Sequence, residues 1–190
     1  MFNTLGREQE IKLYKDLGNN LDNYLLSKVD DKYKSLKKVV VADCDGIIST
    51  NESFYSKDGK VMKSYGCYDK EMIRILEKFG WQFSFVTADK TGYEITQSRV
   101  DDLGCILYVS DANERVNLIK YLKGNNDIVV FLGDSLTDIP ALIEADYAGT
   151  TSNAPQPVKA FCNYISHLPG GYGGFADIMY NIHYLITDKI

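Results

Sequence analysis

The feature that most constrains this chain is a short apolar run that ends in two aspartates, VVVADCDG at residues 39–46. Consecutive β-branched residues indicate a strand buried inside a parallel sheet. Asp43, Asp45 and Gly46 come at its end. One interpretation is a strand followed by a polar turn, because Asp-Gly pairs are frequent in turns. The other is a ligand site, because open α/β sheets place their ligands at the carboxyl ends of strands.

Strand-like and helix-like segments alternate along the rest of the chain. This alternation is typical of a mostly parallel sheet with helices on both faces, and right-handed crossovers make such a sheet doubly wound. The sequence therefore predicts an α/β fold with a Rossmann-like core. The expected strands are 38–43, 81–87, 105–109, 127–133, 146–149 and 163–166, and the expected helices are 69–79, 92–103, 112–123, 137–145 and 174–186. A hairpin is expected at 53–64 around Asp58-Gly59, and Asp69 is expected to cap the first helix.

The length of the chain suits one domain and a short extension. With 190 residues, 45% of them hydrophobic, it can bury one sizeable core. We place this domain at 38–190 and a helical extension at 1–37. Leucines recur every four residues within the extension, as on one face of a helix, at Leu13, Leu17, Leu21 and Leu25.

Composition argues against several classes of function. A net charge of −5 is unfavourable for a general nucleic-acid or membrane-surface binder. The four cysteines are scattered, with no C-x-x-C pair, which favours reduced thiols over disulfides or a structural zinc site. No segment has the length and apolarity of a membrane span, and the first residues lack the apolar core of a signal peptide. We therefore expect a cytoplasmic location.

Polar side chains follow three of the predicted strands. Asp43 and Asp45 end the first, Thr87 closes FSFVT, and Asp134 and Asp138 follow the strand 127–133 in GDSLTD. Each motif alone is compatible with a turn or a helix cap. Together, in this order, they favour a single site, because parallel strands bring their carboxyl ends to one edge. Several carboxylates in one crevice repel each other, and oxygen ligands without histidine indicate a bound Mg²⁺.

A metal-held phosphate beside a carboxylate suggests phosphoryl transfer through an aspartyl-phosphate. Asp45 lies two residues after Asp43, where it could protonate the leaving oxygen and then deprotonate the attacking water. Gly46 would let the backbone turn closely around the phosphoryl group.

In these motifs the chain resembles the haloacid dehalogenase superfamily of phosphotransferases from about residue 38 to 180. Within it the chain looks most like the small capless phosphatases that act on 3-deoxy-manno-octulosonate 8-phosphate (KDO 8-phosphate). The stretches that carry the resemblance include DCDGIIST, DGKVMKSY, LEKFGWQFSFVTADK, GDSLTDIPAL and GGYGGFADI.

The resemblance implies roles for the residues at the strand ends. It implies Asp43 as the nucleophile, Asp45 as the acid/base and Thr87 as a hydrogen-bond donor to the phosphoryl group. It implies Mg²⁺ held by the carboxylates of Asp43 and Asp134 and the backbone carbonyl of Asp45, with Asp138 bracing the site.

Spacing supports the capless type independently. Between Gly46 and the strand at 81 there is room for a hairpin flap and one helix, but not for a cap domain. A neighbouring subunit would then cover the site, and the resemblance implies a homotetramer in which the hairpin and the C-terminal segment meet other subunits' sites. An ordinary surface hairpin remains the alternative.

The chain departs from the family pattern at the cation beside the nucleophile. Where the superfamily has a lysine, the simplest alignment places Glu114, with Arg115 next to it. Arg115 or Lys90 could take the role, or the charge could be missing. A guanidinium is not a plain replacement for an ammonium.

The second departure concerns the substrate. Tyr68, Lys70, Ala88-Asp89 and Ala176 stand where the sugar-acid phosphatases have an arginine-containing pattern. Arginines commonly bind carboxylates, so the substrate is expected to differ from KDO 8-phosphate or to bind differently. A remodelled substrate pocket could include Gly46, Lys63, Tyr65, Lys70 and Ala88.

The leading hypothesis is a Mg²⁺-dependent phosphatase for a small phosphorylated metabolite, a sugar acid or a sugar first. A nucleotide or polynucleotide-end phosphatase is one alternative, although the acidic balance disfavours a nucleic-acid partner. A non-catalytic binding or assembly protein of the same fold is the other. The missing lysine motivates this last alternative, and the intact Asp45 opposes it.

Overall fold

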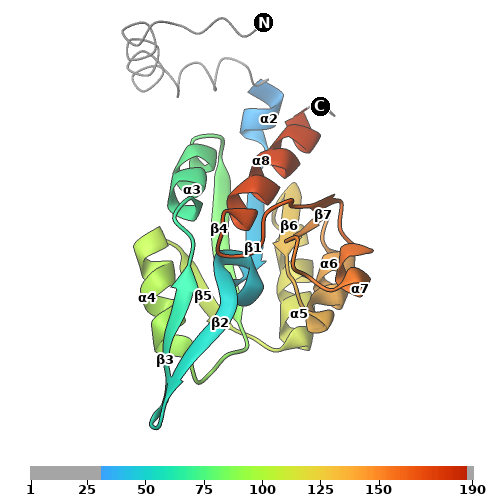
Figure 1. Ribbon diagram of the computed structural model, residues 1–190. Helices are drawn as coiled ribbons and strands as arrows, with labels where there is room; N and C mark the ends of the chain where they lie inside the picture. The colour runs from blue at the N-terminus through green and yellow to red at the C-terminus, as the bar shows by residue number, and fades with distance from the viewer. Residues whose placement is uncertain (1–30, 188–190) are drawn as a thin grey trace, which may run out of the picture.

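The computed structural model describes residues 31–187, and its centre is one six-stranded sheet (Figure 1). The strand order is β5-β4-β1-β6-β7-β8, and all neighbouring strands run parallel. The strands are β1 (Lys38–Asp43), β4 (Trp81–Thr87), β5 (Ile106–Val109), β6 (Ile128–Leu132), β7 (Tyr147–Thr150) and β8 (Tyr164–Ile165). The leucine stripe and most of the extension proposed at 1–37 lie outside the described residues, which include only its part from residue 31, with the helix α2 (Asp31–Ser35).

Helices cover both faces of the sheet, so the doubly wound α/β fold predicted from the sequence is confirmed. One face is covered by α3 (Asp69–Glu77), α4 (Tyr93–Leu103) and α8 (Gly174–Thr187), and the other by α5 (Ala112–Lys123), α6 (Ile139–Glu144) and the short α7 (Gln156–Lys159).

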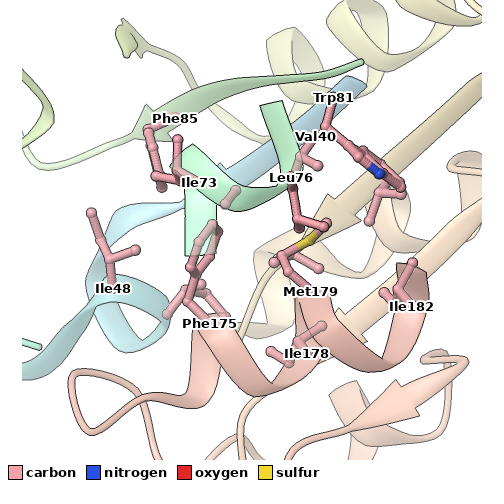
Figure 2. Close-up of a cluster of buried hydrophobic side chains, with 14 of the residues drawn as sticks. Val40, Ile48, Ile73, Leu76, Trp81, Phe85, Phe175, Ile178, Met179 and Ile182 are labelled. Carbon is pink, nitrogen blue, oxygen red and sulfur yellow. The ribbon is translucent and has the colours of Figure 1, made fainter. Parts of the chain in front are cut away.

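The burial of both faces of the central strand β1 explains the run of valines in its sequence. Val40 and Ala42 point into the cluster with α3 and α8, whereas Val39 and Val41 point into the cluster with α5 and α6. Figure 2 shows the first cluster, in which side chains of α8 pack against Val40 and the first helix after the hairpin. Full burial of each such side chain contributes about 1.5–3 kcal/mol, so β1 is held firmly at the middle of the sheet.

The hairpin forms a separate two-stranded antiparallel sheet that projects from the core (Figure 1). It consists of β2 (Ser49–Ser56) and β3 (Gly59–Tyr65), so it begins four residues earlier than predicted. Gly59 has φ 123°, a value that glycine adopts without steric cost. Between the end of β1 and β4 the chain forms a turn, this hairpin and α3, so the absence of a cap domain is confirmed.

Two details of the helices differ from the sequence prediction. The helix expected at 137–145 is a short turn η2 (Leu136–Asp138) followed by α6. Asp69 does not cap α3, because Tyr68 occupies the cap position and the Asp69 carboxylate pairs with Arg99, Oδ2 to Nη2 at 3.4 Å. Burial raises the pKa of Asp69 to about 6 although Arg99 lowers it.

Across the described residues, no helix combines the length and apolarity needed to cross a bilayer.

Candidate active site

Three carboxylates converge at the carboxyl edge of the sheet. Asp43 ends β1, Asp134 follows the neighbouring strand β6, and Asp138 lies in η2. One oxygen from each lies within 4.8 Å of the others, and all three side chains are buried. The sequence prediction that these strand ends meet is therefore confirmed by the geometry.

The electrostatics of this cluster fit a bound cation. Burial and the charge of Asp138 raise the pKa of Asp43 well above its ordinary value, and Arg115 only partly opposes this. Burial and the same neighbour raise the pKa of Asp134 to about 7. Both carboxylates would be stabilised in their charged form by a divalent ion, and an all-oxygen donor set suits Mg²⁺.

Asp138 is already engaged by protein groups. Its Oδ2 accepts hydrogen bonds from the backbone N–H of Ser135 at 3.0 Å and from the Ser135 hydroxyl at 2.8 Å. Its Oδ1 accepts from the Arg115 guanidinium. These contacts orient Asp138 as a brace, which leaves Asp43 and Asp134 as the carboxylates best placed to hold an ion.

Arg115 supplies the positive charge beside Asp43. Its Nη2 lies 3.1 Å from Asp43 Oδ1, its Nη1 pairs with Asp138, and its side chain is 4% exposed. Glu114 instead closes the start of α5, because its carboxylate accepts from the Asp111 N–H at 2.8 Å while Asp111 accepts from the Glu114 N–H at 2.9 Å. Of the two cations considered from the sequence, Lys90 is exposed and Arg115 reaches the cluster.

Asp45 is held by the hairpin. Its Oδ2 lies 2.8 Å from Lys63 Nζ, and its Oδ1 accepts from the Ser49 hydroxyl at 3.1 Å. The Lys63 side chain is fully buried and also bonds Asp89 Oδ2 at 2.8 Å and Thr96 Oγ1 at 2.9 Å. Lys63, which the sequence predicted to line a substrate pocket, therefore contacts the candidate acid/base Asp45 directly.

The turn η1 (Cys44–Ile48), which carries Asp45, packs closely against Asp134. Gly46 has φ 84°, and a Cβ there would lie 1.9 Å from Asp134 Oδ2. Its carbonyl accepts from the Thr151 hydroxyl at 3.0 Å. Gly170, in the GGYGG stretch, packs on the same carbonyl, where a Cβ would come within 2.0 Å. Both positions need glycine because backbone and carboxylate occupy the space that a side chain would take.

Thr87 and Ala88 lie where the sequence placed them. Thr87 ends β4, beside β1, and is 1% exposed. Its hydroxyl oxygen accepts from the Asp89 N–H at 3.1 Å and can still donate its own proton. Ala88 follows directly and is exposed.

Lys70 does not join the cluster. Its Nζ lies 2.6 Å from Asp102 Oδ1, so the lysine joins α3 to α4 at the surface. The structure gives no support to its predicted role in a substrate pocket. Tyr65, by contrast, donates to Thr96 Oγ1 at 3.4 Å and belongs to the polar network around Lys63.

Sequence reasoning missed a carboxylate and a cation at this edge. Asp89 pairs with Lys60 as well as with Lys63, and its other oxygen accepts from the Gly92 N–H at 2.9 Å. Burial opposes ionisation of Asp89, but its bonds to Lys60 and Lys63 outweigh that effect and hold its pKa well below the ordinary range. The signal was present in the sequence, because Asp89 stands where the resemblance leads one to expect an arginine.

Sequence comparisons find distant relatives. No family model matches the chain. It is 24% identical over 145 residues to 3-deoxy-D-manno-octulosonate 8-phosphate phosphatase KdsC of Haemophilus influenzae, which covers 74% of this chain and 79% of that protein. The protein of the same name from Yersinia pestis is 21% identical over 157 residues, covering 80% of this chain and 82% of the relative.

Solved structures share the fold. A probable YrbI family phosphatase from Pseudomonas syringae superposes with a TM-score of 0.70 at 24% identity, covering 80% of this chain and 88% of that one. The cobalt-bound KDO 8-phosphate phosphatase of Haemophilus influenzae has a TM-score of 0.69 at 23% identity, with 80% and 90% covered. The Moraxella catarrhalis enzyme, in complex with magnesium, phosphate and KDO, has a TM-score of 0.68 at 21% identity, with 84% and 97% covered.

Proposed function

From the premise that this chain has the haloacid dehalogenase fold and resembles the KDO 8-phosphate phosphatases, we propose that it is a Mg²⁺-dependent phosphatase of a small phosphorylated sugar or sugar acid. The observation that carries the proposal is the convergence of Asp43, Asp134 and Asp138 within 4.8 Å. The candidate acid/base, Asp45, is two residues after Asp43, on the turn η1 that follows β1.

Asp43 is proposed as the nucleophile. One of its oxygens attacks phosphorus, the bond from phosphorus to the leaving oxygen breaks, and Asp45 gives that oxygen a proton. Asp45 then takes a proton from a water that attacks the aspartyl-phosphate. Phosphate leaves and the Asp43 carboxylate is restored.

The carboxylates of Asp43 and Asp134 would hold Mg²⁺, together with the backbone carbonyl of Asp45 that the resemblance implies. When bound, it would neutralise negative charge on the phosphoryl oxygens.

Arg115 and Thr87 are proposed to position the reacting groups. The Arg115 fork holds Asp43 at 3.1 Å and Asp138 at the same time, so the nucleophile is fixed in one orientation. Thr87 Oγ1, at the end of the strand next to β1, can donate to a phosphoryl oxygen. Thr87 would act on charge that develops on the phosphoryl group, whereas Arg115 acts through the nucleophile that it holds.

The other functions considered from the sequence have less support. A non-catalytic role was motivated by the absent lysine, and the buried Arg115 weakens that motive. The net charge of −5 remains unfavourable for a polynucleotide substrate. The homotetramer, with hairpins covering neighbouring sites, and the cytoplasmic location stay predictions.

The direct test is release of inorganic phosphate from a panel of sugar and sugar-acid phosphates. We expect turnover with Mg²⁺ that EDTA abolishes and that Asp43→Asn abolishes. Asp31→Asn, which removes the same charge from a 97% exposed site in α2, away from the acidic edge, should behave as the wild type. If the wild type with Mg²⁺ releases no phosphate from any member of the panel, the proposal is wrong.

A further inference from the structure

An apolar groove runs between α3 and α8, which lie side by side on one face of the sheet (Figure 1). Two adjoining hollows form it, of about 360 Å³ and about 280 Å³. Both hollows are lined by Met72, Ile75 and Tyr180, so they make one continuous groove. Asp43 and Asp134 line neither hollow, and the groove is therefore separate from the candidate metal site.

The two hollows lie at different ends of α8. The larger one lies by its first turn and is lined by Tyr68, Leu168 and Ala176. The smaller one lies toward its end and is lined by Phe79 and His183. Because an α-helix rises about 1.5 Å per residue, Ala176 and His183 set the two hollows about 10 Å apart.

Large apolar side chains along the groove are open to solvent. Tyr180 is 51% exposed, Tyr184 is 45% exposed and Leu168 is 44% exposed. Contiguous exposed apolar surface of this kind indicates a binding surface, because removing it from water is favourable. Within residues 31–187 no element fills the groove, so its occupant has to come from outside this range.

The chain enters the described structure beside this groove. The Tyr33 hydroxyl of α2 lies 2.7 Å from His183 Nδ1 on α8 (Figure 1). Tyr33 is buried and also accepts a hydrogen bond from Trp81 Nε1 at 2.9 Å, so α2 is anchored there. His183 lines the smaller hollow. The thirty residues that precede Asp31 in the sequence therefore join the fold next to the groove.

These preceding residues carry leucines in a pattern that suits the groove. Leucines recur every fourth residue, as on one face of a helix, at Leu13, Leu17, Leu21 and Leu25. The sequence Gly18-Asn19-Asn20 favours a break and divides them into two pairs. The centres of the two pairs are eight positions apart, about 12 Å along a helix, which is comparable with the separation of the hollows. Two pairs of leucines thus match two hollows.

We propose that residues 11–26 of this chain dock in the groove between α3 and α8, with the second leucine pair in the hollow at His183 and the first pair in the hollow at Leu168. This order needs the shorter connection, since Leu25 stands eight residues before the anchored Tyr33. Eight residues reach up to about 28 Å, so the connection is long enough.

The covalent link favours this occupant over a separate molecule. A tethered segment acts at an effective concentration that is roughly millimolar. An amphipathic helix that lays its apolar face into a groove is a recurring mode of recognition, with anchor residues three or four positions apart. The docking is independent of the reaction proposed at Asp43.

Disulfide trapping in the full chain tests the placement. The exposed Cys67 is first replaced by serine. Leu25→Cys with Tyr184→Cys should then form an intrachain disulfide at least about tenfold faster than Leu25→Cys with Tyr121→Cys. Tyr121 is the matched control because it is 68% exposed on α5, which covers the other face of the sheet. Non-reducing electrophoresis at low protein concentration separates the intrachain product from dimers.

A second pair of cysteines tests the order of the leucines. Leu13→Cys with Leu168→Cys should link within the chain, whereas Leu25→Cys with Leu168→Cys should not. The reverse result would overturn the assignment of the leucine pairs to the hollows. Equal rates in the Tyr184 and Tyr121 pairs, or no disulfide in either, would overturn the docking. Products found only as dimers would overturn it too, because a second copy of the chain would then supply the occupant.

Melting temperatures give a measurement without engineered cysteines. Leu21→Ala should lower the melting temperature of the full chain by about 4–8 °C, as the loss of a buried leucine does in a domain of this size. Asn23→Ala, between the leucines, is the control and should melt within about 1 °C of the wild type. In an Ile75→Ala background the loss from Leu21→Ala should shrink by at least about half, because the two side chains would share the groove. A Leu21→Ala variant that melts with the wild type, or losses that simply add, would contradict docking at this place.

Discussion

The buried ammonium of Lys63, on the hairpin strand β3, lies 2.8 Å from the Asp45 carboxylate on the turn after β1. The hairpin is therefore joined to the candidate acid/base by a charged hydrogen bond, although its tip is exposed. This contact gives the hairpin a part in the site within a single chain.

Lys63→Met should lower kcat by about tenfold to a thousandfold, because Asp45 and Asp89 lose their common partner and Asp45 is no longer held in place. KM should change less, since Lys63 is expected to position Asp45 and not to touch the substrate. Steady-state kinetics on the best panel substrate measure both values. Lys37→Met, at an exposed position directly before the amino end of β1, is the matched control. A larger change in KM than in kcat would argue for direct substrate contact.

Arg115→Met should cost activity and stability together. Removing one partner from a buried ionic network leaves uncompensated charge and destabilises by about 3–5 kcal/mol. Arg115→Lys should recover part of both losses, because an ammonium supplies the charge but not the fork that reaches Asp43 and Asp138 together. Urea unfolding and phosphate release give the two readouts, and Lys120→Met, exposed on the same helix, is the control. Full activity in a folded Arg115→Met would show that the site needs no cation there.

Gly46→Ala should abolish turnover and weaken Mg²⁺ binding. The new Cβ would meet Asp134 Oδ2 at 1.9 Å and would also strain a backbone with φ 84°. Gly104→Ala separates the two effects, because Gly104 has φ 77° and no atom lies within 4 Å of the place that a Cβ would take. Both variants should lose stability, but only Gly46→Ala should lose metal binding by titration calorimetry. Equal metal affinities in the two variants would contradict the contact with Asp134.

Mg²⁺ should stabilise the wild type and not Asp134→Asn. A ligand that binds only the folded state raises stability by about 2.7 kcal/mol at a hundred times its dissociation constant. Thermal melts with increasing Mg²⁺ test this without any substrate. Because Asp127 lies outside the cluster and accepts from the Lys37 N–H, Asp127→Asn serves as the comparison and should keep the Mg²⁺ effect. A wild-type melting temperature that ignores Mg²⁺ would count against a resident ion.

Stability should fall in acid partly through His183. Burial, aided by the charge of Lys38, lowers the pKa of His183 from 6.5 to about 4. The neutral ring shares a hydrogen bond with the Tyr33 hydroxyl at 2.7 Å. The unfolded chain therefore binds a proton first as pH falls, so this contribution is complete above about pH 6.5 and is lost down to about pH 4, a change of about 3 kcal/mol.

Urea unfolding at several pH values can isolate this effect. His183→Gln should show a smaller loss of unfolding free energy between pH 6.5 and 4 than the wild type. The exposed His167 gives the control variant His167→Gln, whose pH dependence should match the wild type. Parallel curves for wild type and His183→Gln would exclude a buried neutral ring.

The sheet and its acidic edge were predictable because both depend on local patterns. Consecutive β-branched residues indicate buried parallel strands, and the edge on which strand ends meet follows from their direction. Asp43 and Asp134 could therefore be placed together from the amino-acid sequence alone. The inward orientation of Arg115 was also predictable from the start of α5. Asp111 and Glu114 form a capping box, which fixes the phase of the helix and turns Arg115 inward.

The contacts of the hairpin could not be predicted in the same way. Which carboxylate Lys63 reaches depends on how the hairpin lies against α4, and no periodicity in the sequence records that placement. Asp69 illustrates the same limit. It stands at a helix start and has good capping chemistry, but its carboxylate pairs with Arg99 of α4 instead. Lys63 and Asp69 each pair with residues that are distant in sequence, and local sequence patterns do not predict such pairs.

The close approach of Gly170 to the Gly46 carbonyl determines when the site can form while the chain is being synthesised. A chain still leaving the ribosome already contains β1 and its aspartates, but the turn that carries Asp45 lacks its backing until the GGYGG stretch has been synthesised. Contacts between segments so distant in sequence carry a loop-closure cost and tend to form slowly. We infer that the nascent polypeptide acquires its reactive geometry only after Gly170 has been synthesised, and that shortened products ending before Gly170 would be inert.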